Sequence, residues 1–245
     1  MALKDDIKSK VKAILDEKFV VTDVTYVPRI DDTKLTFGNT GLKFEATVLY
    51  IDMRGSTELL SKHNRTTVAK IHMAYFHTIV KIANSFGGNV RSFNGDSALV
   101  FFQGTSKGSL STAVKAAMKI KYMLSDSENG INSLLAKYSE INFGIGIDDG
   151  HILCTKIGVG GEHNRDLFWV GHAVNKSTVL SDKAKLPNAI YISSWVYSNL
   201  TDELIYKDSN AAVKINMWNK STINYNGAVQ DCYYTNYHWA LDHND

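Results

Sequence analysis

The chain is 245 residues long, with 44% hydrophobic and 21% charged residues, a composition typical of globular proteins that excludes disordered and collagen-like chains. Its 27 basic and 25 acidic side chains nearly balance, which argues against nucleic acid as the main partner. With 17 Gly and only 2 Pro, no linker is evident, so we expect one domain. It comprises an N-terminal helix and extension (residues 1–43), a core (44–200) and C-terminal strands that complete the same domain (201–245).

The first segment, up to Phe19, is predicted to form an amphipathic helix. Ile7, Val11 and Ile14 recur there at helical spacing between Lys and Asp side chains. We expect the apolar face to pack on the rest of the domain or on a partner subunit. Because the segment is charged and no apolar run of about 18 residues occurs, we expect a cytoplasmic protein without a membrane span.

The next elements are predicted from apolar periodicity and turn residues. Residues 44–52, FEATVLYID, form a strand that becomes almost wholly apolar, as expected where a strand enters a core. Apolar residues in steps of three and four predict a helix over 66–86. Two short strands, 89–94 and 97–102, follow, with an Asn94-Gly95-Asp96 hairpin turn between them.

The second half of the chain continues the alternation of strands and helices. We expect a helix over 109–124, a strand over 141–147 with a hairpin partner over 151–157, a helix over 171–184, a strand over 189–193, and short strands from about 201 around an Asn226-Gly227 turn. The order βαββαβ predicts the α+β class, with an antiparallel-rich sheet, helices on one face, and an N-terminal helix and C-terminal hairpin as additions.

Two acidic residues are candidates for chemistry. Asp52 closes the first core strand and precedes Met53-Arg54-Gly55-Ser56-Thr57, a turn that can aim backbone N–H groups at an anion. If that strand neighbours the hairpin, Asp96 lies within reach of Asp52, and such carboxylate pairs commonly hold hard divalent cations. Metals beside a phosphate-binding turn predict phosphoryl transfer. The simpler alternative is that Asp52 caps the next helix and Asp96 only fills its turn.

The residues around Asp52 resemble the first metal-binding motif of the class III nucleotidyl cyclases, the adenylate and guanylate cyclase superfamily. They read Tyr50-Ile51-Asp52-Met53-Arg54-Gly55-Ser56-Thr57. Asn94-Gly95-Asp96 is similar to the second metal motif, and Gly171-His172-Ala173-Val174-Asn175 is similar to a later signature. The three motifs occur in the family's order over about residues 44–200, which makes the resemblance far more specific than any one motif.

This resemblance implies a ferredoxin-like core and a homodimer whose active sites lie between two chains. It implies that Asp52, Asp96 and the Met53 carbonyl hold two Mg²⁺ or Mn²⁺ ions, one for the ribose 3′-hydroxyl and one for the triphosphate. The Gly55-Ser56-Thr57 turn would bind the substrate, and Asn175 would reach it from the partner subunit.

Departures from the family pattern bear on the base. Ser92 and Phe168 occupy the positions that select purines in the family, and neither supplies a purine-reading group. The resemblance therefore implies a smaller base in contact with Ser92 and Phe168. Tyr50 replaces the usual Phe and shares a strand face with Asp52, which would bring its hydroxyl near the nucleotide. A core aromatic with a satisfied hydroxyl is the alternative for Tyr50.

Within the superfamily, the chain looks most like the pyrimidine cyclases of bacterial Pycsar anti-phage systems. The similarity lies in Tyr50, in the Arg54–Thr57 run and in the segment from Tyr26 to Asn39. It implies cyclic UMP as product, or alternatively cyclic CMP, read by a separate effector protein. Val179 stands where purine cyclases carry an Arg. Either Arg54 or Lys176 supplies the catalytic cation instead, or the chain is a degenerate cyclase fold that dimerises or senses nucleotides.

A serine hydrolase is the main rival from another class. Gly104-Thr105-Ser106-Lys107-Gly108 fits the G-x-S-x-G nucleophile elbow between a strand and a helix. No acid and His downstream can be singled out as triad partners, so we expect ordinary loop residues there. Gly158-Val159-Gly160-Gly161 lacks the spacing of a dinucleotide fingerprint and is also predicted to be a loop.

Overall fold

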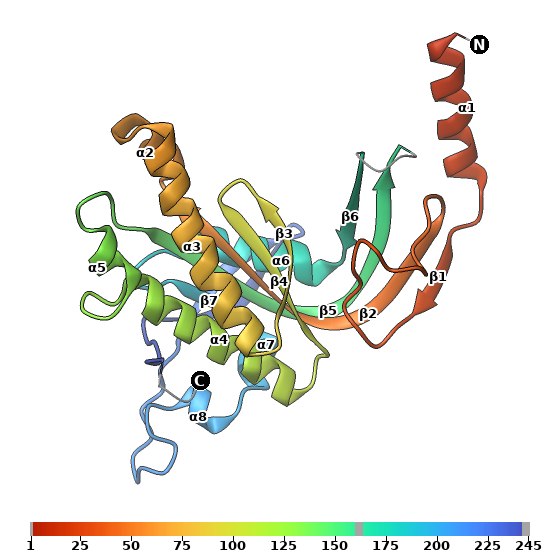
Figure 1. Cartoon of the computed structure of the whole chain (residues 1–245). Coiled ribbons are helices and arrows are strands. Elements are labelled where there is room, and N and C mark those ends of the chain that lie inside the picture. The colour runs from red at the N-terminus through yellow and green to blue at the C-terminus, as the bar shows by residue number, and fades with distance from the viewer. Residues whose placement is uncertain (1, 160–163, 242–245) are drawn as a thin grey trace.

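The computed structural model describes residues 2–159 and 164–241, which form one large sheet with helices against it (Figure 1). The strands are β1 (Val20–Asp23), β2 (Thr40–Arg54), β3 (Asn89–Asn94), β4 (Ser97–Gln103), β5 (Asn142–Gly158), β6 (Arg165–Val170), β7 (Ile190–Ser193), β8 (Asn219–Tyr225) and β9 (Ala228–Thr235). The helices are α1 (Leu3–Asp16), α2 (Ser56–Lys62), α3 (Arg65–Ser85), α4 (Lys107–Ser125), α5 (Ile131–Leu135), α6 (His172–Lys183), α7 (Ser194–Ser198) and α8 (Asp202–Ile205).

The sheet has the order β3-β4-β2-β5-β7-β9-β8, with β1 paired to β2 and β6 paired to β5. The β1–β2 and β5–β7 pairs are parallel, and the other described pairs are antiparallel. This arrangement confirms the predicted α+β class, the βαββαβ core, and the helix and hairpin added at its ends. No helix among the described residues is both long enough and apolar enough to cross a membrane.

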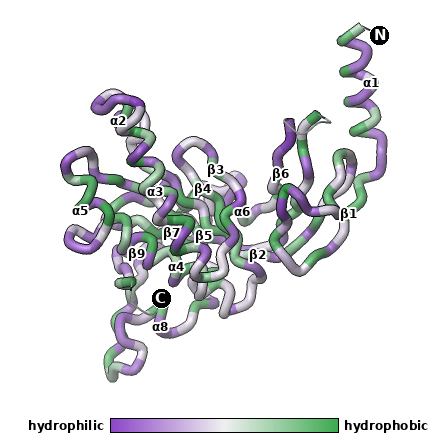
Figure 2. Tube along the Cα trace, viewed as in Figure 1, coloured by the Kyte–Doolittle hydropathy of each residue, from purple (hydrophilic) through white to green (hydrophobic). Residues whose placement is uncertain are grey.

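Alternation along β2 sends side chains to two separate apolar clusters. Leu49, Ile51 and Met53 face α3 and α4 in the larger cluster, which is green along the central elements in Figure 2. Val48 and Phe44 point the other way, toward α6 and the segment between β1 and β2. Helices therefore cover both faces of the sheet, whereas the sequence predicted helices on one face only. Helix α6 packs on the face that carries Asp52, whereas α3 and α4 pack on the opposite face.

The predicted hairpin over 141–147 and 151–157 is wrong, because these residues form one continuous strand, β5. The run Asp148-Asp149-Gly150 has turn-like composition, yet it pairs with the middle of β2, with Thr47 opposite Asp149. Asp148 is buried and its carboxyl bonds to the Ser193 side chain, which satisfies a polar group in mid-strand. The true hairpin partner of β5 is β6, which the sequence analysis did not identify.

Helix α1 is a helix as predicted, but none of its residues is buried. It extends away from the sheet in Figure 1, and the side chain of Asn39 ties down its C-terminal end by donating to the carbonyls of Ile14 and Glu17, both at 2.8 Å. Ile7 is 52% exposed and Val11 48% exposed. The expected packing of this apolar face on its own domain is therefore not observed.

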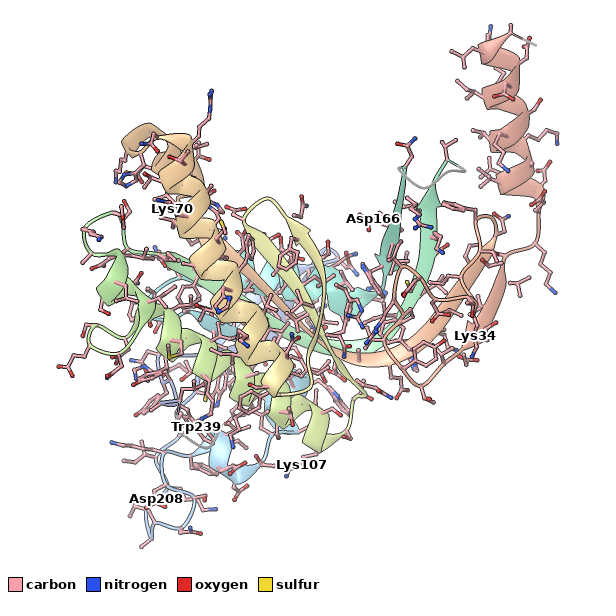
Figure 3. All side chains as sticks on the ribbon, viewed as in Figure 1. Lys34, Lys70, Lys107, Asp166, Asp208 and Trp239 are labelled. Atoms are coloured by element: carbon pink, nitrogen blue, oxygen red, sulfur yellow. The ribbon has the colours of Figure 1, made fainter. Side chains whose placement is uncertain are left out.

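The C-terminal strands follow a short helix, α8, rather than starting near residue 201 as predicted. The Asn226-Gly227 turn joins β8 to β9 as expected, with both residues at positive φ. Beyond β9 the chain returns along α4, where Lys119 Nζ donates to the carbonyl of Ala240 at 2.9 Å and Lys121 Nζ donates to that of Asn236. Residues 236–241, here called the C-terminal strap, include Trp239, labelled near the C-terminus in Figure 3.

Candidate active site

Asp52 and Asp96 meet where β2 and the β3–β4 hairpin end together. Asp52 pairs with Ser97 across the β2–β4 ladder, and Asp96 lies in the hairpin turn just before Ser97. The backbone N–H of Met53 donates to the carbonyl of Asp96 at 3.3 Å. The two carboxyl groups are within hydrogen-bonding reach of each other. The structure therefore brings together the three residues that the sequence assigns to metal binding.

The electrostatics of Asp52 are unfavourable for an isolated carboxylate. Burial, followed by the charge of Asp96, raises the pKa of Asp52 from 3.8 to about 6. Arg54 opposes this shift, and Asp182, at the C-terminal end of α6, adds to it. Asp182 is a neighbour that the sequence analysis missed, because no motif spacing links it to Asp52.

Arg54 lies against Asp52 and the end of α6. Its Nη1 donates to Asp52 Oδ2 at 2.5 Å, its Nε donates to the Ala184 carbonyl at 3.1 Å, and its Nη2 donates to the Ser181 carbonyl. The side chain is 24% exposed. That Arg54 supplies the catalytic cation in place of the Arg missing at Val179 remains a prediction, and its guanidinium here donates to protein oxygens.

Tyr50 and Ser92 share the face of the sheet that carries Asp52. Both pair with Leu99 of β4, Tyr50 from β2 and Ser92 from β3, so the three residues form a row across the strands. The Tyr50 hydroxyl lies within hydrogen-bonding reach of the Ser97 side chain, and burial raises the pKa of Tyr50. A nucleotide base placed over Leu99 would therefore meet a hydroxyl on either side.

The turn after Asp52 has the geometry of a helix start. Gly55 is the N-cap of α2, and its φ of 74° lies in the left-handed region that favours glycine. Ser56 and Thr57 form the first turn of α2, where backbone N–H groups have no partner within the helix. These groups lie two and three residues beyond Arg54, and their proposed role as phosphate donors remains a prediction.

Asn175, Phe168 and Val179 are not in contact with the acids of their own chain. Asn175 is exposed on α6, two helical turns before Asp182, which places it about 10 Å away along the helix axis. Phe168 is 52% exposed on β6, on the strand face opposite to buried Trp169. Val179 packs on the apolar cluster beneath β8 and β9. One chain alone therefore does not assemble all the predicted site residues.

The donor set at Asp52 and Asp96 fits a hard divalent cation. Two carboxylates with a backbone carbonyl nearby are oxygen ligands of the kind that Mg²⁺ and Mn²⁺ take, and a cation would relieve the charge repulsion between Asp52 and Asp96. Within residues 2–159 and 164–241, no group of three or more His, Cys, Asp or Glu side chains is arranged around a common metal position. The candidate site therefore rests on this pair of acids.

The residues of the rival hydrolase motif have a structural role. Ser106 is the N-cap of α4, and its Oγ accepts a hydrogen bond from the N–H of Ser109 at 3.2 Å. It also bonds to the Ser109 hydroxyl at 3.0 Å. Of the predicted glycine-rich loop at 158–161, residues 160 and 161 lie outside the described residues.

Comparisons with known proteins point to one family. The adenylate and guanylate cyclase catalytic domain matches residues 42–232. A uridylate cyclase of Xanthomonas perforans is 32% identical over 248 residues, covering 99% of this chain and 100% of the relative. A uridylate cyclase of Burkholderia cepacia is 31% identical over 222 residues, covering 89% and 91% of the two chains.

Solved structures show the same fold. The guanylyl cyclase Cya2 superposes with a TM-score of 0.63 at 21% identity, covering 79% of this chain and 92% of the other. The adenylyl cyclase CyaB from P. aeruginosa superposes with a TM-score of 0.60 at 21% identity, covering 80% and 95%. Cyclase domains of this kind bind a nucleoside triphosphate and usually dimerise. With the match over residues 42–232 and relatives aligned over nearly its whole length, the chain belongs to the family of adenylate and guanylate cyclase catalytic domains.

Proposed function

We propose that the protein is a homodimeric cyclase that converts UTP to 3′,5′-cyclic UMP and pyrophosphate. The observation that carries the reaction is the pairing of Asp52 with Asp96 beside the Gly55-Ser56-Thr57 turn. The uridylate cyclase name of relatives at 32% and 31% identity supports UTP over CTP. Cyclic CMP remains the second candidate product, because a Ser92 hydroxyl can donate or accept and so serves either pyrimidine.

In the proposed reaction the ribose 3′-oxygen attacks the α-phosphorus of the same nucleotide. A bond forms between these two atoms, the bond from the α-phosphorus to the bridging oxygen of pyrophosphate breaks, and the hydroxyl proton leaves to solvent. Two Mg²⁺ or Mn²⁺ ions would favour the ionised 3′-oxygen and balance the charge on the phosphates. Asp52, Asp96 and the Met53 carbonyl would hold these ions.

The remaining residues bind and orient the substrate. The N–H groups at the start of α2, in the Gly55-Ser56-Thr57 turn, would receive phosphate oxygens. Tyr50 and Ser92 offer hydroxyls on one face of the sheet. Phe168 offers an exposed aromatic surface, and Asn175 an exposed amide on α6, for a site completed by the partner subunit. The product would act on a separate effector in anti-phage defence.

The first experiment is mass spectrometry of the products formed from ATP, GTP, CTP and UTP in one tube with Mn²⁺. Cyclic UMP from the wild-type protein, and none from Asp52→Asn, is the expected result. Cyclic CMP alone would replace UTP by CTP in the proposal. Cyclic AMP or cyclic GMP would contradict the roles given to Ser92 and Phe168. No cyclic product from any nucleotide would favour the degenerate alternative, for which Val179 in place of an Arg is the motivating observation.

A further inference from the structure

The guanidinium of Arg54 donates hydrogen bonds to three other residues of the protein. Its guanidinium points along the sheet toward α6, where Nε and Nη2 donate to the carbonyls of Ala184 and Ser181. The remaining guanidinium nitrogen, Nη1, donates to Asp52 Oδ2 at 2.5 Å. A planar guanidinium whose three nitrogens each donate to a protein oxygen has one preferred orientation.

The oxygens that receive Arg54 are themselves held in place. Ser181 is fully buried, and its hydroxyl donates to the carbonyl of Gly144 on β5 at 2.9 Å. The last carbonyls of a helix carry partial negative charge and favour a nearby cation. Arg54 is therefore anchored to a rigid, electronegative helix end, and through Nη1 it fixes the position of the Asp52 carboxylate.

Asp52 is surrounded by like charge, with Asp96 and Asp182 both acting on it. Arg54 is the cation recorded in a salt bridge with Asp52 among the residues that the structure describes. A divalent cation at this carboxylate needs the same oxygen lone pairs and the same negative charge. Arg54 and the cation are thus alternative partners of one group.

We infer that Arg54 is the internal counterion of Asp52, a positioning residue that competes with the divalent cation and sets how tightly the site binds it. The inference rests on the proposed function in one respect, that Asp52 and Asp96 bind a divalent cation. It does not require that the nucleotide is cyclised. Loss of the arginine frees the carboxylate oxygen and removes a positive charge beside the metal position, and both effects tighten cation binding.

The test is isothermal titration of the full-length protein with Mn²⁺ in the absence of nucleotide. Arg54→Met is expected to bind Mn²⁺ about fivefold more tightly than the wild type, the change that corresponds to one modest ion-pair interaction. Arg65→Met is the matched control, because Arg65 is an exposed arginine at the start of α3, and its affinity should equal that of the wild type. Adding Asp52→Asn to Arg54→Met should remove the gain.

A second measurement separates competition from a purely structural role. Melting temperatures are recorded with a chelator and with Mn²⁺. Arg54→Met should melt below the wild type in chelator and recover more on addition of Mn²⁺. If it melts lower by the same amount in both buffers while its Mn²⁺ affinity is unchanged, Arg54 only holds α6 and the inference is wrong. If Arg54→Met does not fold, Arg54→Lys replaces it: a point charge cannot span Asp52 and both carbonyls, and an intermediate affinity is expected.

The outcomes for the inference and for the proposed function are distinguishable. Tighter Mn²⁺ binding by Arg54→Met, together with no cyclic product from the wild type, would support the counterion and contradict the cyclase. Weaker binding by a folded Arg54→Met, or a folded Arg54→Met that binds no Mn²⁺, would contradict the counterion whatever the products are.

Discussion

At the scale of single residues, the charge around Asp52 links stability to function. The folded-state pKa of about 6 lies above the ordinary 3.8, so the folded protein binds more protons than the unfolded chain between these values. Ionisation of Asp52 therefore lowers the free energy of unfolding as pH rises from about 4 to 6, and this loss is complete above pH 6. A carboxylate kept at such a cost is typical of sites selected for chemistry rather than stability.

This cost predicts the effect of removing the charge. In chelator at pH 7.5, Asp52→Asn should be more stable than the wild type by about 1 kcal/mol, after solvent screening reduces the roughly 3 kcal/mol that two pKa units represent. At pH 4.5, which lies between the two pKa values, the gain should shrink to about a third, and it should vanish only below the ordinary pKa of 3.8. Urea unfolding at both pH values measures this. Asp231→Asn, which removes an exposed acid paired with Lys220, is the control without a gain. A less stable Asp52→Asn at pH 7.5 would refute the account.

The base-selecting role proposed for Ser92 and Phe168 can also be tested by substitution. The family resemblance implies that adenylate cyclases read adenine with a Lys at the position of Ser92 and an Asp at that of Phe168, so the double variant Ser92→Lys with Phe168→Asp should accept ATP. Competition between UTP and ATP, followed by mass spectrometry, gives the ratio of cyclic products. The single variant Ser92→Ala is the companion control and should lower turnover of UTP without admitting ATP. An unchanged preference in the double variant would remove both residues from the base site.

At the scale of elements, β5 and α6 can approach each other closely because Gly146 of β5 has no side chain. A Cβ on Gly146 would lie 1.9 Å from the Ser177 carbonyl and 2.4 Å from the Ser181 amide nitrogen. Neither backbone atom can move without shifting α6, the helix that carries Asn175 and receives Arg54. The close approach of strand and helix therefore sets the geometry at both ends of α6.

Gly146→Ala should accordingly cost about 2–3 kcal/mol of stability, as expected for overpacking against backbone. Metal binding and turnover should fall with it, because α6 is displaced. Gly108→Ala is the matched control: its Cβ would meet nothing closer than 3.7 Å in α4, and stability should be unchanged or raised by up to about 1 kcal/mol. Thermal unfolding of the two variants, each compared with the wild type, tests this prediction. Equal stability would mean that α6 can move away at no cost.

The C-terminal strap depends on buried lysines of α4. Burial lowers the pKa of Lys121 from 10.5 to about 8 while its Nζ donates to the Asn236 carbonyl. The unfolded chain therefore binds more protons than the folded protein between these values, and wild-type stability gains from this residue as pH rises from about 8 to 10.5. The increase in the free energy of unfolding between pH 7.5 and 9.5 should be absent in Lys121→Met. The same variant should expose the C-terminal strap to limited proteolysis. Lys70→Met, at an exposed position of α3, should keep both properties of the wild type.

Much of this level of structure was predictable from sequence, for physical reasons. Strong periodicity identified the long helices α3 and α4, and the Asn94-Gly95-Asp96 turn identified the hairpin that carries an acid. The continuity of β5 was not predictable, because Asp148 and Asp149 have turn composition and are stabilised only by tertiary partners such as Ser193. The contact of Arg54 with Ser181, 127 residues away, has no local signal at all.

At the scale of the whole molecule, the proposed function predicts that a second copy of the chain supplies Asn175 to the acids of the first. Asn175 faces solvent on α6, and so does Phe168 on β6. If two chains exchange these elements, each site takes its acids from one chain and its amide from the other.

Complementation tests this arrangement. Asp52→Ala and Asn175→Ala should each be inactive alone, since every site in either dimer lacks one group. When equal amounts are co-expressed and allowed to form dimers at random, half of the dimers are mixed and each has one intact site, so about a quarter of wild-type activity should return. A mixture with no activity would show that each chain supplies its own Asn175.

The pairing of β2 with β5 also determines how the chain must fold. Leu42 pairs with Cys154 and Arg54 with Asn142, so the two central strands are joined only through residues 55–141, which contain α2 to α5, β3 and β4, and such non-local pairing slows folding. During synthesis, one edge of β2 has no partner until β5 has left the ribosome, although α3, β3, β4 and α4 emerge earlier. The nascent chain thus passes through a stage with an open, apolar strand edge, and its yield in cells should depend on chaperones that bind such edges.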